Sequence, residues 1–290
     1  MSFLWKKRKE IARLMRLEKP YGTLLLLLPT LWSLFVASEG RPTLKHLAVF
    51  IIGSFLMRSA GCVANDMADR KFDARVERTK ARPLAAKTLT TKQALIVLVI
   101  LLSFSFLTVL QLNLFTILLS FAALFVALLY PFSKRVTHLP QMVLGIAFSW
   151  GILMAWTAVR NSLSITPVLI LLANLFWATG YDTVYALMDR DDDVRIGVKS
   201  TAILFGRQSW LAVAFFYSLV ILFLSLAGKQ LQMGVIYYAA LTGMALFFLF
   251  QSIQLRKLPG RAALFSLFRS HVWVGLIILI GIALNYHLKS

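Results

Sequence analysis

The chain has 290 residues, of which 59% are apolar and only 15% are charged. Soluble domains usually carry about 25% charged and about 45–50% apolar residues. The composition therefore excludes an ordinary soluble enzyme and a disordered chain, and it indicates an integral membrane protein. The single cysteine, Cys62, excludes an internal disulfide and a cysteine-based metal site.

The chain begins with a basic segment, 1–19, that lacks the small-residue cleavage site of a signal peptide. Charge-free stretches long enough to cross a bilayer follow at 20–38, 93–133, 136–159, 161–181, 208–228, 230–255 and 270–288. The stretch 93–133 is too long for one helix and divides at 111–113, and 44–64 is a further span that contains Arg58. The sequence therefore predicts an all-α, multi-pass protein with about nine transmembrane helices.

The spans predict one transmembrane domain over residues 1–290. The same aspartate spacing recurs about 120 residues apart, each time at the end of the second helix of a four-helix group. This recurrence indicates an internal four-helix repeat over about 20–132 and 139–252, followed by a final helix at 270–288.

The basic residues alternate between the two sides of the predicted spans. With a cytoplasmic N-terminus, 25 Lys and Arg residues lie on the cytoplasmic side and five lie on the opposite side. This distribution is the positive-inside pattern of membrane proteins. The net charge of +19 is therefore a topology signal, with some attraction to anionic membrane lipid, and it gives no reason to expect nucleic-acid binding.

Arg58 lies within the second predicted span, where a charge is costly and usually functional. It precedes Asn65 by seven residues and Asp69 by eleven, so it lies on their helical stripe about 10–16 Å deeper. This depth suits the carboxylate of a second substrate that lies beneath a diphosphate. A structural pairing of Arg58 with backbone carbonyls or with an aspartate is the alternative.

All eight aspartates of the chain lie in two short segments, each at the end of a predicted span. On ideal helices, two sets of three each share one helical face: Asp66, Asp69 and Asp73, and then Asp182, Asp189 and Asp193. The topology places both sets at the cytoplasmic face, with Tyr185 near the second. Like charges at this spacing repel one another, and desolvation at the membrane boundary adds to the cost.

Carboxylate oxygens suit Mg²⁺, which usually binds through one or two carboxylates together with substrate phosphates. We therefore expect the two aspartate sets to face each other and to hold two or more Mg²⁺ ions around a diphosphate. A solvated loop that is neutralised by nearby basic residues is the alternative.

Basic and aromatic residues flank the aspartates at the same predicted face. Arg78, Lys80 and Arg82 follow the first set, and Lys199 follows the second, so all four are candidates for contacts to phosphate oxygens. Lys134 is a further phosphate candidate, and the ring of Tyr130 is suited to lie beside a carbocation. The positive-inside distribution of charge explains the basic residues that follow the aspartates equally well. For Tyr130 and Lys134, the alternative is that they anchor the helix at the membrane interface.

The two aspartate motifs together resemble those of the UbiA-type intramembrane aromatic prenyltransferases. They are Asn65-Asp66-x-x-Asp69-x-x-x-Asp73 and Tyr181-Asp182-Thr-x-Tyr185-Ala-x-x-Asp189-Arg-Asp-Asp-Asp193. The segments Met57-Arg58, Tyr130-Pro131-x-x-Lys134 and Lys199-Ser200-Thr201 are similar to the bacterial branch of this family that prenylates 4-hydroxybenzoate.

The resemblance implies nine helices around a central cavity open to the cytoplasmic side, a bacterial inner-membrane location and a role in ubiquinone biosynthesis. With the alternation of basic residues, the C-terminus is expected on the periplasmic side. It implies an enzyme that uses Mg²⁺ to transfer a polyprenyl group from polyprenyl diphosphate to 4-hydroxybenzoate. By motif position, the residues that would hold Mg²⁺–diphosphate are Asn65, Asp69, Asp73, Asp189 and Asp193, supported by Asp66 and Asp182. Arg78, Arg82 and Lys134 would assist with phosphate, and Arg58 would meet the aromatic acid.

Two alternatives remain open on the sequence. The prenyl acceptor could be a naphthoate, haem or chlorophyllide, although Arg58 and the Tyr185 segment favour a benzoate. A cation transporter could also use intramembrane aspartates. Such a transporter would usually place them near the bilayer midplane on broken helices, whereas these aspartates lie at one edge.

Overall fold

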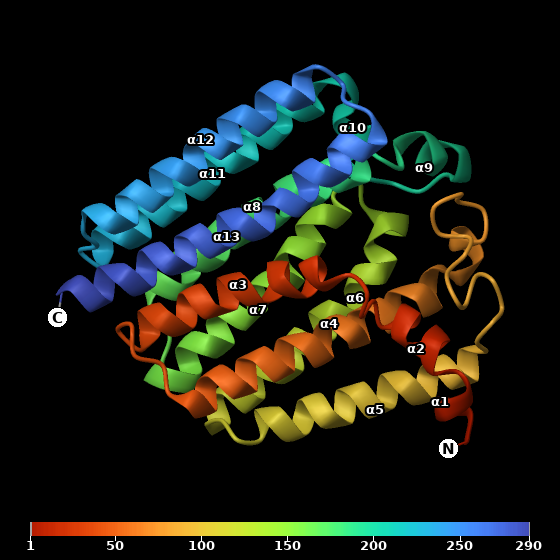
Figure 1. Ribbon diagram of the computed structural model, residues 1–290, viewed down its shortest axis with the longest axis horizontal. Helices are drawn as coiled ribbons and strands as arrows, with labels where there is room; N and C mark the ends of the chain where they lie inside the picture. The colour runs from red at the N-terminus through yellow and green to blue at the C-terminus, as the bar shows by residue number, and fades with distance from the viewer. Residues whose placement is uncertain (1, 290) are drawn as a thin grey trace.

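A computed structural model describes residues 2–289, which form α-helices and connecting turns without a strand (Figure 1). Met1 and Ser290, which the predicted domain includes, lie outside the described residues. The helices are α1 Ser2–Lys6, α2 Arg8–Leu14, α3 Pro20–Ala37, α4 Leu44–Asp73, α5 Thr91–Val109, α6 Leu114–Val136, α7 Pro140–Arg160, α8 Ile165–Ala186, α9 Arg190–Ile196, α10 Thr201–Phe205, α11 Ser209–Gln230, α12 Val235–Arg256 and α13 Arg261–Lys289, with a 3₁₀ turn η1 at Gly206–Gln208.

Within residues 2–289, nine helices are long and apolar enough to cross a membrane, as the sequence predicts. The predicted division of 93–133 is confirmed: α5 ends at Val109, and the Asn113 side chain caps α6 by accepting a hydrogen bond from the Thr116 amide at 2.9 Å. An N-cap of this kind satisfies one of the free amides at the start of a helix, so Asn113 marks where the new helix begins.

Two helices extend beyond their predicted spans because a helix continues after its apolar stretch has ended. Helix α4 continues through the first aspartate segment to Asp73, and α13 already begins at Arg261. The 30 residues of α4 span about 45 Å, whereas the hydrocarbon core of a bilayer is about 30 Å thick. The last turns of α4 therefore reach beyond the hydrocarbon, which is where its aspartates lie.

The prediction that Asp182, Asp189 and Asp193 share one continuous helix is wrong. Helix α8 ends at Ala186, the chain turns, and Asp189 precedes the short helix α9. Acidic residues are favourable in the first turn of a helix because of its partial positive charge. The run of aspartates at 191–193 therefore favours a new helix start over continuation of α8.

The bundle has two ends with different connections (Figure 1). The turns between α3 and α4, α5 and α6, α7 and α8, and α11 and α12 lie at the left-hand end, where the C-terminus also lies. The segment 74–90, helices α9 and α10 and the N-terminal helices gather at the right-hand end. Both aspartate segments therefore reach the same end of the bundle, as the alternation of spans predicts.

A buried polar network joins α8, α11, α12 and α13 in the largest core. The Trp177 Nε1 donates a hydrogen bond to His271 Nδ1 at 2.8 Å, so a neutral His271 carries its proton on Nε2. That Nε2 lies 2.9 Å from Gln251 Oε1 and 3.0 Å from the Tyr217 hydroxyl, which itself donates to Gln251. These contacts fix one side of the bundle, against which α3, α4 and α7 enclose the site.

Candidate active site

The first aspartate segment forms one wall of a polar cleft at the end of the bundle. Asn65, Asp69 and Asp73 recur every four residues on α4, so they lie on one side of the helix. Asp69 is fully buried and Asp73 is 7% exposed. The wall therefore presents carboxylate and amide oxygens to the space beside α4.

The second segment forms the facing wall through three different positions of the chain. Asp182 lies in the last turns of α8, Asp189 follows in the turn, and Asp193 lies in the first turn of α9. Burial and the nearby Asp189 carboxylate raise the pKa of Asp193 to about 7. A cation beside Asp193 would therefore stabilise its ionised form.

The two aspartate segments line a space of about 180 Å³, which we call the acidic cleft. It brings together nearly all of the residues that the sequence predicts for metal and diphosphate binding. Those that line it are Asn65, Asp69, Asp73, Arg78, Arg82, Tyr130, Lys134, Asp182, Tyr185, Asp189, Asp193 and Lys199. Asp66 and Arg58 do not line it, and neither does Lys80, which pairs with Glu77 at 2.7 Å.

Each of three cations reaches across to one carboxylate of the cleft. Lys134 at the end of α6 pairs with Asp69, and Arg82 Nη1 lies 2.9 and 3.0 Å from the two carboxylate oxygens of Asp73. Arg78 Nε donates to Asp189 at 2.8 Å, and Arg78 also contacts the Tyr185 hydroxyl. The segment that carries Arg78 and Arg82 therefore folds over both walls, and these cations offset the repulsion between the carboxylates.

The donor atoms of the acidic cleft fit Mg²⁺. One carboxylate oxygen of Asp69, Oδ1, is buried without a hydrogen-bond partner. Within the described residues, no three His, Cys, Asp or Glu side chains converge closely enough to hold a metal on their own. Magnesium does not need such a cage, because it commonly takes one or two carboxylates and completes its shell with phosphate oxygens and water.

Asp66 lies apart from the acidic cleft, although it is part of the same motif. It is 1% exposed and lies between two arginines, with Arg16 Nη2 at 2.7 Å and Arg82 Nη1 at 3.1 Å from its Oδ1. Asp66 thereby ties the N-terminal segment to the segment that covers the cleft. Its observed contacts are those of an ion-pair partner within the protein.

A second, larger space, the central cavity, of about 390 Å³, adjoins the acidic cleft. Six residues line both spaces: Asn65, Arg78, Arg82, Tyr130, Asp182 and Tyr185. The cavity continues along α4 past Arg58 to Gly53 and Val49, where α5, α6 and α7 also line it. A ligand could therefore place a polar head in the cleft and an apolar body in the cavity.

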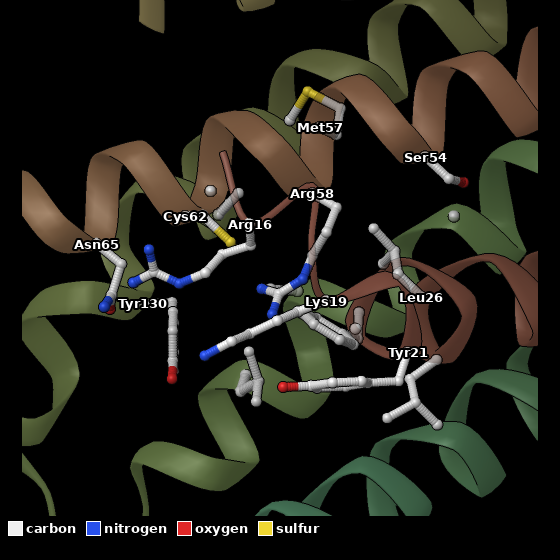
Figure 2. A pocket seen from close by; sticks show the side chains of 18 of the residues that line it. Arg16, Lys19, Tyr21, Leu26, Ser54, Met57, Arg58, Cys62, Asn65 and Tyr130 are labelled. Atoms are coloured by element: carbon white, nitrogen blue, oxygen red, sulfur yellow. The ribbon is translucent and has the colours of Figure 1, made fainter. Parts of the chain in front are cut away.

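Arg58 points into the central cavity together with Lys19, Tyr21 and Tyr130 (Figure 2). Its guanidinium carbon lies 5.7 Å from the centre of the Phe148 ring. In the described part of the chain, no aspartate or backbone carbonyl forms an ion pair or hydrogen bond with Arg58. The alternative of a structural pairing is therefore not supported.

The N-terminal segment contributes residues to the site that the sequence analysis missed. Arg13 Nη2 donates to the carbonyl of Ala81 at 3.1 Å, Arg16 pairs with Asp66, and Arg13, Arg16 and Lys19 all line the central cavity. The basic character of 1–19 predicts an interfacial segment equally well, so composition alone could not reveal these contacts. One sequence feature could have indicated them. Each aspartate motif carries more acidic than basic residues, so cations from elsewhere in the sequence are needed to balance its charge.

Comparisons with known proteins agree with this geometry. Residues 26–275 match the UbiA prenyltransferase family. A 4-hydroxybenzoate octaprenyltransferase from Cronobacter sakazakii is 53% identical over 276 residues, which cover 94% of each chain. One from Pseudomonas aeruginosa is 46% identical over 280 residues, or 97% of this chain and 94% of that protein.

Solved structures share the fold. A UbiA homologue from Aeropyrum pernix has a TM-score of 0.79 at 24% identity, over 90% of this chain and 97% of that one. A UbiA homologue from Archaeoglobus fulgidus, bound to GPP and Mg²⁺, has a TM-score of 0.70 at 14% identity, over 93% of this chain and 99% of that one. At these identities the likeness shows the fold.

The position of Asp66 between two arginines predicts a stability effect. Changing Asp66→Asn leaves Arg16 and Arg82 without their shared carboxylate, and loss of one partner of a buried pair is costly. We expect the apparent melting temperature of the purified protein to fall by about 5 °C or more. Asp191→Asn, at an exposed aspartate, is the matched control and should shift it little. Equal melting temperatures for the two variants would contradict this assignment.

Proposed function

The chain belongs to the UbiA prenyltransferase family, and from that membership we propose that it transfers a polyprenyl group from polyprenyl diphosphate to 4-hydroxybenzoate, at the ring carbon ortho to the hydroxyl. The observation that carries the proposal is that the acidic cleft and the central cavity adjoin each other. A cleft lined by aspartates and phosphate-binding cations adjoins a mainly apolar cavity that holds Arg58. The product would enter ubiquinone biosynthesis.

We propose that the acidic cleft binds the diphosphate. Asn65, Asp69, Asp73, Asp189 and Asp193 would hold Mg²⁺, with Asp182 in support, and Lys199 would contact phosphate. Bound Mg²⁺ would supply positive charge for the leaving oxygens. Arg78, Arg82 and Lys134 would exchange their carboxylate partners in part for phosphate oxygens and donate hydrogen bonds to them.

The reaction would take place where the two spaces join. The bond between the allylic carbon and the diphosphate oxygen breaks, and the oxygen keeps the electron pair. The allylic cation lies beside the rings of Tyr130 and Tyr185, whose faces favour positive charge. The ring carbon of the acceptor then bonds to the allylic carbon and loses its proton. The apolar walls keep water away from the cation.

The deep part of the central cavity would hold the polyprenyl tail. Its lining beyond Arg58 is made of small and apolar residues of α4 to α7, among them Gly53, Thr108 and Ala127. A chain with many isoprene units is longer than this space, so its far end would pass between helices into the lipid. With the tail bound in this way, the allylic carbon would lie at the junction with the acidic cleft.

We also propose that the protein is one domain of the bacterial inner membrane with a cytoplasmic N-terminus and a periplasmic C-terminus. The end of the bundle that carries the site also carries most of the basic residues, which supports this orientation. Helix packing supports the internal repeat. The pairs α3–α4, α4–α5 and α5–α6 correspond in order to α7–α8, α8–α11 and α11–α12, and all six pairs are in contact.

The proposal is tested most simply with purified membranes and labelled 4-hydroxybenzoate. With a polyprenyl diphosphate and Mg²⁺, the label should pass into a lipid-soluble product, and EDTA should stop the reaction. If the label stays in the aqueous phase while a naphthoate or a tetrapyrrole is prenylated, the acceptor assignment is wrong.

The metal-binding role of both walls predicts that either wall is indispensable. Asp69→Asn and Asp189→Asn should each reduce kcat by about a thousandfold or more, because each removes charge that holds the metal beside the leaving group. The measurement is turnover of protein that has been shown to insert and to elute normally on size exclusion. Asp191→Asn is the control, and near-normal turnover of either cleft variant would refute the assignment.

The tail assignment predicts a change in donor preference. A Cβ built on Gly53 would meet only Thr108 Oγ1, at 3.9 Å, so Gly53→Phe would place its ring in the cavity rather than against backbone. We expect kcat/KM for long polyprenyl diphosphates to fall by about tenfold, equivalent to 1.4 kcal/mol, with a smaller effect on geranyl diphosphate.

The matched control for this prediction is Gly243→Phe, which introduces the same ring on α12 at an exposed glycine with open space around it. It should leave the preference among donors unchanged. An equal loss with short and long donors in Gly53→Phe would contradict a tail-binding role for this part of the cavity.

A further inference from the structure

Two cations of the central cavity, Lys19 and Arg58, have neither an ion pair nor a side-chain hydrogen bond in the part of the chain that the structure describes. The other basic groups around the site have partners. Arg16 pairs with Asp66, Arg82 with Asp66 and Asp73, Arg78 with Asp189, and Lys134 with Asp69, whereas Arg13 and Lys199 donate to the backbone carbonyls of Ala81 and Val136. Lys19 and Arg58 are therefore left available for an anion that enters from outside.

The start of α3 brings the two cations to the same region of the cavity. Lys19 is the residue before the first turn of α3, and Gly22 lies within that turn. A Cβ at Gly22 would lie 2.7 Å from Arg58 Nη2, so the absence of a side chain lets the guanidinium rest against α3. In Figure 2 the Lys19 ammonium, the Tyr21 hydroxyl and the Arg58 guanidinium all extend into the same space.

The surroundings of Lys19 suit a ligand-binding group. The residue is exposed and also lines the central cavity, so an incoming ligand can reach it. Burial of part of its side chain and the charge of Arg16 lower its pKa. The lowered pKa means that the surrounding protein disfavours the charged form, which an incoming anion would stabilise.

The two spaces of the site distinguish which anion this is. Lys134 and Lys199 line the acidic cleft and not the central cavity, whereas Arg78 and Arg82 line both. Lys19 and Arg58 line the central cavity and not the cleft. The diphosphate therefore has its own cations, and the other pair is placed for an anion on the second substrate.

We propose that Lys19 is a substrate-positioning residue that binds the carboxylate of the aromatic acceptor together with Arg58. The inference rests on the proposed function and extends it, because it assigns a second cation to the acid group and a role to the start of α3. The Tyr21 hydroxyl is placed to donate a hydrogen bond to the same carboxylate. With the acid end held there, the ring would point its hydroxyl-bearing end toward Tyr130 and the acidic cleft.

The test compares an acceptor that carries a carboxylate with one that lacks it. In purified protein, Lys19→Gln should raise KM for 4-hydroxybenzoate by about tenfold, in line with loss of one charge-assisted hydrogen bond. The KM values for polyprenyl diphosphate and for the neutral analogue 4-hydroxybenzamide should change by less than about twofold. Lys19→Arg should restore most of the affinity for the acid, and Lys9→Gln, in the same basic segment, should resemble the wild type.

Several results would overturn the inference. An unchanged KM for the acid in Lys19→Gln would remove Lys19 from this role, and a rise in KM for polyprenyl diphosphate alone would assign it to the phosphate site. Equal losses with the acid and the amide would indicate a general structural role. Failure of the proposed function is distinguishable, because it would show already in the wild-type protein as absence of 4-hydroxybenzoate prenylation.

Discussion

The constraint on which the structure depends is that several carboxylates, which repel one another, lie close together at the edge of a membrane. Their negative charge must be offset. Asp69 and Asp73 on α4 face Asp189 and Asp193 across one cleft, and burial there makes each uncompensated negative charge costly. In the protein alone, Lys134, Arg82 and Arg78 supply the opposing charge. A metal–diphosphate complex has the mixed charge that such a site requires, since its cations meet the carboxylates and its phosphate oxygens meet the basic groups. The same side chains could therefore pair with one another in the protein alone and with a bound metal–diphosphate complex.

The bundle separates the two chemical tasks of the site along the membrane normal. The polar head of the donor would bind at the end of the bundle, where α4 extends beyond the hydrocarbon and the segment 74–90 folds over the aspartates. The apolar part of the cavity lies deeper, beside Gly53 and Arg58. A prenyl donor is amphipathic in the same sense, with a charged head and an insoluble tail. On the proposed function, the fold would match the donor by depth and would position the reacting carbon where the two environments meet.

Much of the fold could be predicted from the sequence because the bilayer constrains it so strongly. Span lengths, the polar break at Asn113 and the alternation of basic residues predict about nine membrane-spanning helices, as found within residues 2–289, and put both aspartate motifs at one end. The break between α8 and α9 could not be predicted by extending a helical stripe, since local charge at 191–193 decides it. Arg16 and Lys19 escaped prediction for another reason. The Arg16–Asp66 pair joins residues 50 apart in the sequence, and Lys19 comes to line the central cavity only in the folded chain, whereas composition identifies both residues only as basic.

The most direct test of the central claim is whether a metal binds only when both aspartate walls and a diphosphate are present. Mn²⁺, used in place of Mg²⁺, can be followed by electron paramagnetic resonance on the purified protein with and without a non-reactive prenyl thiolodiphosphate. The account predicts weak Mn²⁺ binding to the protein alone, tight binding with the analogue, and loss of the tight binding in both Asp69→Asn and Asp189→Asn. Tight Mn²⁺ binding without the analogue, or binding that survives in either variant, would contradict it.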